Sequence, residues 1–286
     1  MIYISSSSIK GKTKIEEVLQ IMFNQGFHNI ELSGGTEFQE DILEVLLEQK
    51  EKLNLNFLCH NYFPAPAQHF VVNLASLNDD IHQWSMDHFK RSIDLSHGIG
   101  AKQFGLHAGF YTDIFVNQIG KNIEKRPIYD KQKSFSKFCK SFEELKKYSN
   151  GRVQLYIENN VIAEHNYINY DNFNFFMLTN AEEYFELQRH IEFDLLLDVA
   201  HLNVSANTLG LNFQQEIDTL WQQSNYIHIS DNDGKKDLNS PLSKGSSIEK
   251  FVAQASKAGK IFTMEVYASD LEIRKTIELF DPQKQT

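Results

Sequence analysis

The chain has 286 residues, of which 41% are hydrophobic and 23% charged, and this balance is typical of a folded globular protein and argues against a disordered one. Its formal net charge of −10 argues against a general nucleic-acid binder, because neutralising phosphates requires clustered Lys and Arg, although a local basic patch stays compatible with it. Apolar runs fall short of the roughly 20 residues that cross a bilayer, and the two cysteines, Cys59 and Cys139, indicate a reducing cytoplasm rather than a disulfide framework.

Strand-like and helix-like segments alternate along the whole chain, with no linker or low-complexity tract between them. Eight apolar runs predict strands at 1–5, 28–33, 55–62, 103–108, 154–159, 194–199, 226–230 and 261–266. We expect the first run to be a strand and not a secretion signal, because it has no basic region. Apolar residues three and four positions apart predict helices at 15–22, 135–145, 213–221 and 248–255. Helices at 39–50, 78–97, 180–190 and 269–280 complete eight strand-then-helix units.

This alternation indicates a parallel sheet, which is either a closed barrel or an open doubly wound sheet. An open sheet normally carries a Gly-rich phosphate loop after its first strand. The first loop here, Ser5-Ser-Ser-Ser-Ile-Lys-Gly-Lys-Thr13, has neither the G-x-G-x-x-G nor the P-loop spacing. The sequence therefore favours the α/β class and a single (β/α)8 TIM barrel over residues 1–286.

Two long loops follow the fourth and fifth strands, at 109–130 and 160–179, and in a barrel both lie on the catalytic face. A basic cluster occupies the first loop and the start of the next helix, where we expect it to be solvated: Lys121, Lys125, Arg126, Lys131 and Lys133. The second loop is rich in Asn and aromatic residues. These either shape a lid or a polar-ligand pocket, or anchor the loop to the core through Phe173, Phe175 and Phe176.

The last four predicted strands each end in a strong metal ligand: Glu158, Asp198, His228 and Glu265. An ionised carboxylate inside a barrel is unfavourable unless it is paired or bound to metal, and three that converge repel one another. A divalent cation is the economical explanation, and a buried polar network is the alternative. Three carboxylates and one imidazole suit Mn²⁺, Co²⁺, Mg²⁺ or Zn²⁺, and the set has no thiolate that would select zinc.

Three upstream strands also end in ionisable residues. His60 and His107 end the third and fourth, and with the last four strands they form a run of six consecutive strands that place a carboxylate or an imidazole where the strand ends converge. Glu31 ends the second strand, where it either adds a polar wall or forms a structural salt bridge. The remaining histidines fall mostly on helices and loops, and we expect them at the surface: His28, His69, His82, His88, His97, His165 and His190.

The strand-end residues follow one another in a fixed order along the chain, and three local motifs accompany them: Asp198-Val-Ala-His201-Leu-Asn, His228-Ile-Ser-Asp231-Asn-Asp-Gly and Asp237-Leu-Asn-Ser-Pro-Leu-Ser-Lys-Gly245. With these motifs, the chain resembles the xylose isomerase-like TIM-barrel superfamily, in which the third motif reads D-x-H-x-P-L-G-x-G. The resemblance spans nearly the whole chain. The superfamily contains sugar and sugar-phosphate isomerases and epimerases, some dehydratases, and the type IV apurinic endonucleases.

The resemblance implies that the residues at the ends of strands five to eight are the ligands of a central divalent metal. His60 and His107 fall where the endonucleases hold a second zinc ion jointly with Glu158; alternatively, they line the pore and hydrogen-bond a sugar hydroxyl. His201 corresponds to a substrate-binding residue in the epimerases and, with Asp237, to ligands of a third zinc ion in the endonucleases.

The sequence departs from the endonuclease pattern at two places, which counts against a DNA-repair enzyme without excluding it. The endonucleases complete their third zinc site with a histidine, but that position is Asn239 here, and a neutral amide is a poor zinc ligand. The loop after the second strand, Ser33-Gly-Gly-Thr-Glu37, offers no Arg or Lys to contact phosphate.

The function implied is a divalent-metal-dependent sugar or sugar-phosphate isomerase or epimerase, which transfers a proton through a metal-stabilised enediolate. Glu158 and Glu265 would exchange the proton, and His201, His107 and His60 would orient hydroxyls. One alternative is phosphoester hydrolysis at a centre of two zinc ions. Another is a non-catalytic barrel that binds metal or sugar. We expect a cytoplasmic protein without membrane attachment, and the superfamily suggests a homo-oligomer.

Overall fold

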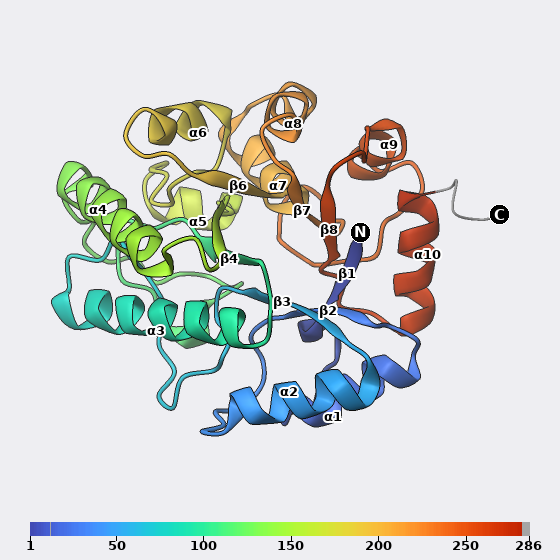
Figure 1. The fold of residues 1–286 in the computed structure, drawn as a ribbon. Coiled ribbons are helices and arrows are strands. Elements are labelled where there is room, and N and C mark those ends of the chain that lie inside the picture. The colour runs from blue at the N-terminus through green and yellow to red at the C-terminus, as the bar shows by residue number, and fades with distance from the viewer. Residues whose placement is uncertain (12, 282–286) are drawn as a thin grey trace.

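The computed structural model describes residues 1–11 and 13–281, and over these residues eight parallel strands close into one barrel (Figure 1). The strands follow chain order around the barrel, and β8 pairs with β1 to close it. Their bounds are β1 Ile2–Ser5, β2 Asn29–Leu32, β3 Asn56–His60, β4 Gln103–His107, β5 Gln154–Glu158, β6 Asp194–Asp198, β7 Tyr226–Ile229 and β8 Ile261–Met264. The predicted (β/α)8 barrel is confirmed.

Helices connect the strands on the outside of the barrel (Figure 1). In the described part of the chain they are α1 Ile15–Asn24, α2 Ile42–Leu53, α3 Asp79–Gly98, α4 Lys131–Ser149, α5 Glu164–Asn169, α6 Ala181–Gln188, α7 Val199–Leu209, α8 Phe213–Trp221, α9 Ser247–Gln254 and α10 Asp270–Phe280. Two short 3₁₀ segments, η1 Ser6–Ser8 and η2 Val116–Gln118, lie in loops. Every helix predicted from the apolar spacing is present, whereas α5 and α7 were not predicted.

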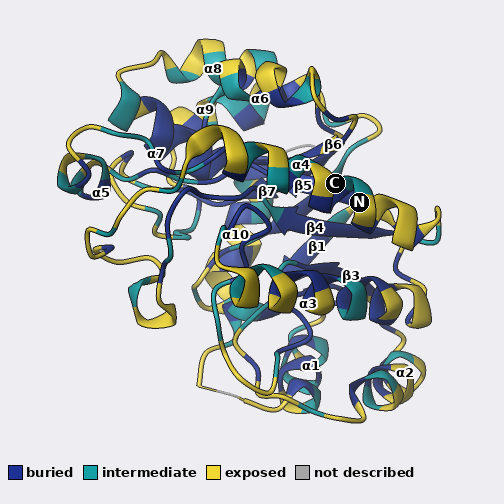
Figure 2. Cartoon of the chain, turned by 90° about the vertical axis from the view of Figure 1, so that its left-hand side faces the viewer, coloured by how far each residue is buried: buried dark blue, intermediate teal, exposed yellow. Residues whose placement is uncertain are grey.

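The barrel interior is filled by an apolar layer that lies directly beneath the strand ends. Five strands contribute its side chains: Tyr3, Leu58, Tyr156, Leu196 and Tyr226. Each of them lies two residues before the last inward-facing position of its strand, because successive side chains alternate between the two faces. Figure 2 shows that the strands at the centre of the molecule are buried, whereas the exposed residues lie on the outer helices. The layer separates the carboxyl ends of the strands from the other end of the barrel.

Gly105 in β4 occupies an inward-facing position where a larger residue would not fit. A Cβ atom there would lie 2.7 Å from Cδ2 of Leu196 and 3.1 Å from Cδ2 of His60. Both distances are shorter than an ordinary carbon–carbon contact of about 3.5–4.0 Å. The absence of a side chain at this position therefore leaves room for the His60 ring inside the barrel.

The two long loops pack against each other. Their side chains form a separate buried cluster: Phe110, Ile114, Ile123, Ile162, Tyr170 and Phe175. Phe110 and Phe176 also form an isolated antiparallel bridge between the loops. Phe175 is fully buried in this cluster, so it anchors its loop to the other long loop, whereas the sequence had suggested anchoring to the main core.

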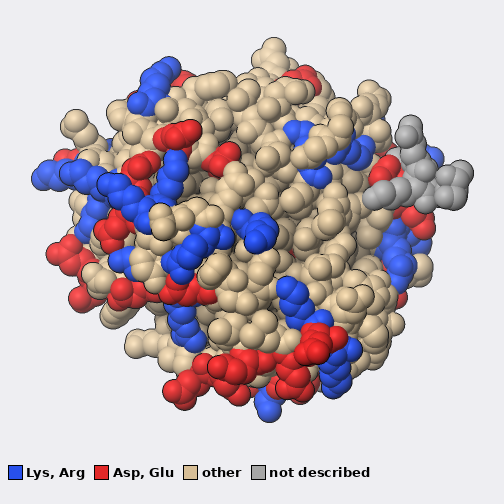
Figure 3. All heavy atoms as spheres, viewed as in Figure 1, with Lys and Arg blue, Asp and Glu red and all other residues tan. Residues whose placement is uncertain are grey.

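Charged side chains of both signs are interspersed on the face of the molecule seen in Figure 3. Two members of the basic cluster are paired with acidic neighbours: Lys125 Nζ lies 2.6 Å from Asp171, and Arg126 lies 3.1 Å from Glu124. Such pairing lowers the positive potential that the loop offers to an anion. Within the described residues, no helix combines the length and the apolar character that a membrane crossing requires.

Candidate metal centre

The four predicted metal ligands converge at the carboxyl ends of neighbouring strands. Glu158 is the last residue of β5 and Asp198 the last of β6. His228 lies in β7, in register with Asp198, and Glu265 directly follows β8. One candidate ligand atom from each residue lies within 4.8 Å of those from the other three. Closure of the barrel thus gathers three carboxylates and one imidazole.

Nδ1 of His228 is the common neighbour of the three carboxylates. It lies 3.0 Å from Glu265 Oε2, 3.3 Å from Glu158 Oε1 and 4.0 Å from Asp198 Oδ2. Glu158, Asp198 and His228 are fully buried, whereas 13% of the Glu265 side chain is exposed. Glu265 is therefore the member of the group that a molecule entering from solvent meets first.

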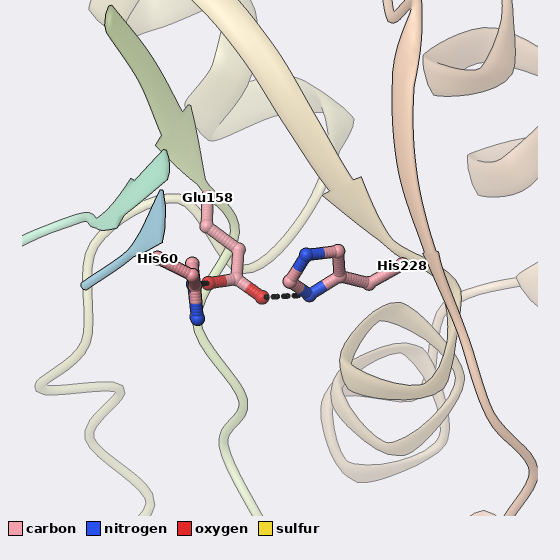
Figure 4. A group of neighbouring side chains, drawn as sticks. All are labelled: His60, Glu158 and His228. Atoms are coloured by element: carbon pink, nitrogen blue, oxygen red, sulfur yellow. Dashed lines mark hydrogen bonds and ion pairs between the residues drawn. The ribbon is translucent and has the colours of Figure 1, made fainter. Parts of the chain in front are cut away.

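The second oxygen of Glu158 faces the two upstream histidines. Oε2 lies 2.6 Å from Nε2 of His60 and 3.3 Å from Nδ1 of His107. Figure 4 shows the Glu158 carboxylate between His60 on one side and His228 on the other. Within 4.8 Å, candidate ligand atoms of Glu158 group with those of His60 and His228 and, separately, with those of His107 and His201, so Glu158 is common to all of these groups.

His201 and Asp198 are tied together at the start of α7. One Asp198 oxygen, Oδ1, accepts a hydrogen bond of 2.7 Å from the His201 backbone N–H and so caps the helix. The His201 ring has Nδ1 2.9 Å from the carbonyl oxygen of Asn159, and Nδ1–H donation there leaves Nε2 facing Asp237 Oδ2 at 3.4 Å. His201 also groups with His107 and Glu158 within 4.8 Å.

Asn239 occupies the position at which the endonuclease pattern has a histidine. Its backbone is in the left-handed region, with φ of 46°, and its carbonyl oxygen accepts a hydrogen bond from the backbone N–H of Tyr267. Its side-chain Oδ1 accepts a hydrogen bond of 3.4 Å from the Ser230 hydroxyl. The side-chain amide of Asn239 is therefore hydrogen-bonded to Ser230 rather than to the pair of His201 and Asp237.

Glu31 lies on the opposite side of His228 from the other carboxylates. Both of its oxygens are 3.1 Å from Nε2 of His228, and the residue is fully buried. The structure thus brings every residue predicted for the site into one connected cluster.

Several atoms of this cluster are buried donors or acceptors without a hydrogen-bond partner in the described structure: Glu158 Oε1, Asp198 Oδ2, His228 Nδ1, His107 Nδ1 and Asp237 Oδ1. Buried polar atoms are normally hydrogen-bonded, so such a concentration requires an explanation. A divalent cation would satisfy the first three, because they are oxygen and nitrogen atoms that face one another. The residues present therefore fit a metal ion.

Protonation shows how this cluster balances its charge. Burial raises the pKa of Asp198 to about 7, and the nearby Glu158 adds to the rise. Burial alone would also raise the pKa of Glu158, but the histidines around it hold it well below its usual range. Burial lowers the pKa of His107 to about 4, whereas neighbouring carboxylates raise the pKa of His60, His201 and His228, so the compensating positive charge at neutral pH lies on these three histidines. A cation would take the place of those protons, so we expect metal binding to depend on pH.

Two contributions to the site were missed by the sequence analysis. The Asn159 side chain hydrogen-bonds both the backbone N–H and the carbonyl oxygen of Asp198 and so holds β6 beside β5. Tyr226 and Thr263 contact Glu31 inside the barrel. Strand alternation could have found Tyr226, which shares its face with His228.

The surface position expected for His88 is wrong. Only 6% of this residue is exposed, and its Nε2 lies 2.9 Å from the carbonyl oxygen of Asn61. Its ring also packs beside Tyr62 in the loop that follows β3, with 5.5 Å between the ring centroids. The α3 helix turns this histidine towards the core, which a helical position alone did not reveal.

Comparison with known proteins places this geometry in context. The family model described as xylose isomerase-like TIM barrel matches residues 19–283. A D-tagatose 3-epimerase-like protein superposes with a TM-score of 0.71 at 14% identity, over 97% of this chain and 94% of that one. A putative xylose isomerase from Rhodospirillum rubrum gives 0.71 at 13% identity, over 98% and 97%. Endonuclease IV from Thermus thermophilus gives 0.61 at 13% identity, over 98% and 96%. No curated protein sequence matches. At these identities the structural likeness shows the fold alone.

Proposed function

The chain belongs to the xylose isomerase-like TIM barrel family, and from this premise we propose that it is a divalent-metal-dependent isomerase or epimerase of a small sugar or sugar phosphate. One observation carries the proposal: candidate ligand atoms of Glu158, Asp198, His228 and Glu265 lie within 4.8 Å of one another. This donor set suits Mn²⁺, Co²⁺, Mg²⁺ or Zn²⁺. A D-tagatose 3-epimerase-like protein among the similar folds is compatible with the proposal.

A divalent cation at this centre supplies a Lewis acid for the substrate's carbonyl and neighbouring hydroxyl oxygens, which makes the adjacent C–H more acidic. Glu158 and Glu265 then act as the proton-transfer pair. They extend from β5 and from the end of β8, so they approach a bound sugar from two directions. One carboxylate removes the proton and the other returns it, which gives 1,2-isomerisation or epimerisation next to the carbonyl.

The surrounding residues orient the substrate and keep water out. His107 is 29% exposed at its side chain and His201 lies beside it, with 5.7 Å between their ring centroids. Both rings can hydrogen-bond sugar hydroxyls at the mouth. The apolar layer beneath the centre blocks access from the other end of the barrel, and a low-dielectric environment strengthens the electrostatic interactions of the site.

Hydrogen exchange in heavy water tests this proposal. Purified protein is incubated in D₂O with Mn²⁺, Co²⁺, Mg²⁺ or Zn²⁺ and a panel of aldoses, ketoses and their phosphates. The expected result is deuterium at the carbon next to the carbonyl of at least one sugar, and loss of this signal in Glu158→Gln. If no sugar exchanges deuterium with any of the metals, proton transfer is not the function.

Phosphoester hydrolysis is the second candidate, and the position of Glu158 between two histidine groups favours it. With Oε2 at 2.6 Å from His60 and 3.3 Å from His107, a second ion could share this carboxylate, as two-metal phosphoester chemistry requires. Metal analysis separates the candidates, because about one ion per chain favours the isomerase and two zinc ions favour the hydrolase. A protein that binds metal yet neither exchanges deuterium nor cleaves bis(p-nitrophenyl) phosphate or an abasic oligonucleotide would be a binding barrel.

A further inference from the structure

Glu31 is a carboxylate buried inside the barrel. It lies in β2, is fully buried, and faces β7 and β8 across the interior. Its Oε2 accepts hydrogen bonds from the Tyr226 hydroxyl and, at 2.8 Å, from the Thr263 hydroxyl. Both oxygens also lie 3.1 Å from Nε2 of His228. The hydrogen bonds of Oε2 all come from donors, which suits a buried ionised carboxylate, whereas Oε1 has no hydrogen-bond partner in the described structure and lies only at ion-pair distance from His228.

The bond to Glu31 determines which nitrogen of His228 can bind a cation. A carboxylate accepts only, so Nε2 must carry the proton that is shared with Glu31. In the neutral ring the lone pair then belongs to Nδ1. That atom faces Glu265 Oε2 at 3.0 Å and Glu158 Oε1 at 3.3 Å, and has no hydrogen-bond partner among the residues that the structure describes. The free nitrogen therefore points into the group of carboxylates.

Two other histidines of the cluster, His201 and His60, lack this arrangement in the described structure. The ring of His201 is oriented by a backbone carbonyl oxygen, that of Asn159, which carries no net charge. His60 places its Nε2 directly on Glu158, one of the candidate ligands. A carboxylate behind a histidine makes the ring a better electron donor, whereas a carbonyl does so less. His228 is thus better prepared than His201 or His60 to hold a cation.

We propose that Glu31 is a positioning residue for the metal centre: it holds His228 in the tautomer that directs the Nδ1 lone pair at the cation, and it thereby strengthens binding of a divalent ion by the four-residue group. This inference rests on the proposed function, because it requires a metal ion at that group. Tyr226 and Thr263 serve the same end, since their hydroxyls fix the carboxylate.

The barrel offers a matched pair of tyrosines for the test. Tyr226 and Tyr156 are both fully buried in the same apolar layer, with 5.3 Å between their ring centroids. The Tyr226 hydroxyl binds Glu31, whereas the Tyr156 hydroxyl binds Gln103 and Asn225, away from the centre. Loss of either hydroxyl disturbs the interior in a similar way, but only loss of the Tyr226 hydroxyl disturbs Glu31.

The experiment titrates the metal-stripped protein with Mn²⁺ and with Zn²⁺ alone, by calorimetry, in wild type, Glu31→Gln, Tyr226→Phe and Tyr156→Phe. We expect about 10–100-fold weaker binding in Glu31→Gln, as for other groups that orient a metal-bound histidine. Tyr226→Phe should show a smaller loss, and Tyr156→Phe should bind like wild type. Nitrogen NMR of the zinc-loaded protein gives a second readout. In wild type the His228 Nε2 proton should be protected from exchange, and in Glu31→Gln it should exchange faster.

The inference is overturned, with the proposed function intact, if wild type binds the ions and Glu31→Gln binds them equally well with an unchanged Nε2 proton. It is also overturned if Tyr156→Phe weakens binding as much as Tyr226→Phe, because the effect would then be general to the barrel interior. Should Glu31→Gln fail to fold, the comparison of the two tyrosine variants decides. A wild type that binds neither ion at the four residues contradicts the proposed function, and this inference with it.

Discussion

Replacing Gly105 with alanine should destabilise the barrel and disturb one side of the site. The new Cβ would lie 2.7 Å from Leu196 Cδ2 and 3.1 Å from His60 Cδ2, both inside the closed barrel. Overpacking of this kind destabilises by about 1–3 kcal/mol. Reduced freedom of the unfolded chain offsets about 0.4–1 kcal/mol of that loss. We therefore expect a net loss of up to about 2.6 kcal/mol in the free energy of unfolding, with a central value of about 1.3 kcal/mol.

Gly34→Ala is the matched control, because its Cβ would meet Tyr62 at an ordinary distance of 3.4 Å. This variant should be as stable as wild type or slightly more stable. Urea unfolding of both variants in the presence of a chelator measures the difference without a contribution from metal. The His60 ring must also move in Gly105→Ala, so its NMR signals should shift. Equal stability of the two alanine variants, with unchanged His60 signals, would refute the packing argument.

Three further predictions concern charge and metal. Glu158→Gln removes a charge at nearly constant shape, so deuterium exchange should fall by about 10²–10⁴-fold while circular dichroism stays that of wild type; wild-type exchange in this variant would contradict its role as a base. Removing the metal with a chelator should lower the free energy of unfolding by about 2.7 kcal/mol relative to protein at a metal concentration of 100 times Kd, and unchanged melting would count against the assigned ligands. Burial lowers the pKa of His88 from 6.5 to about 4, so between these pH values the unfolded chain binds a proton that the folded one does not. The stability that this neutral ring contributes is complete above pH 6.5 and is lost as the pH falls towards 4, by up to about 3 kcal/mol. His88→Gln should therefore lose less stability than wild type between pH 7 and pH 4.5 in urea unfolding, and identical losses would show that His88 does not titrate as described.

The fold and the strand-end residues could be predicted because they depend on local patterns. Apolar runs and helical spacing predicted the strands and most of the helices, and a barrel of parallel strands brings strand ends to one mouth. The α7 helix escaped prediction because all of its first eight residues are buried, so its apolar residues form no stripe. His88 was misjudged for a related reason, since a position on a helix does not reveal which side faces the core.

The detailed contacts of the site could not be predicted, because they depend on how the closed barrel aligns distant strands. Glu31 and His228 are 197 residues apart and meet across the interior. The sequence left open whether Glu31 lines a pocket or forms a salt bridge. Only the register of β7 and β8 against β1 and β2 determines that its carboxylate faces His228. Likewise, the sequence placed Glu158 at a strand end but did not indicate that its two oxygens face different histidines.

Anomalous diffraction from crystals of the protein soaked in Mn²⁺ or Zn²⁺ tests the central claim most directly. The account predicts an anomalous peak within bonding distance of Glu158, Asp198, His228 and Glu265, whose candidate ligand atoms already lie within 4.8 Å of one another. Soaked crystals with no peak at these four side chains, or with ions bound elsewhere only, would contradict it.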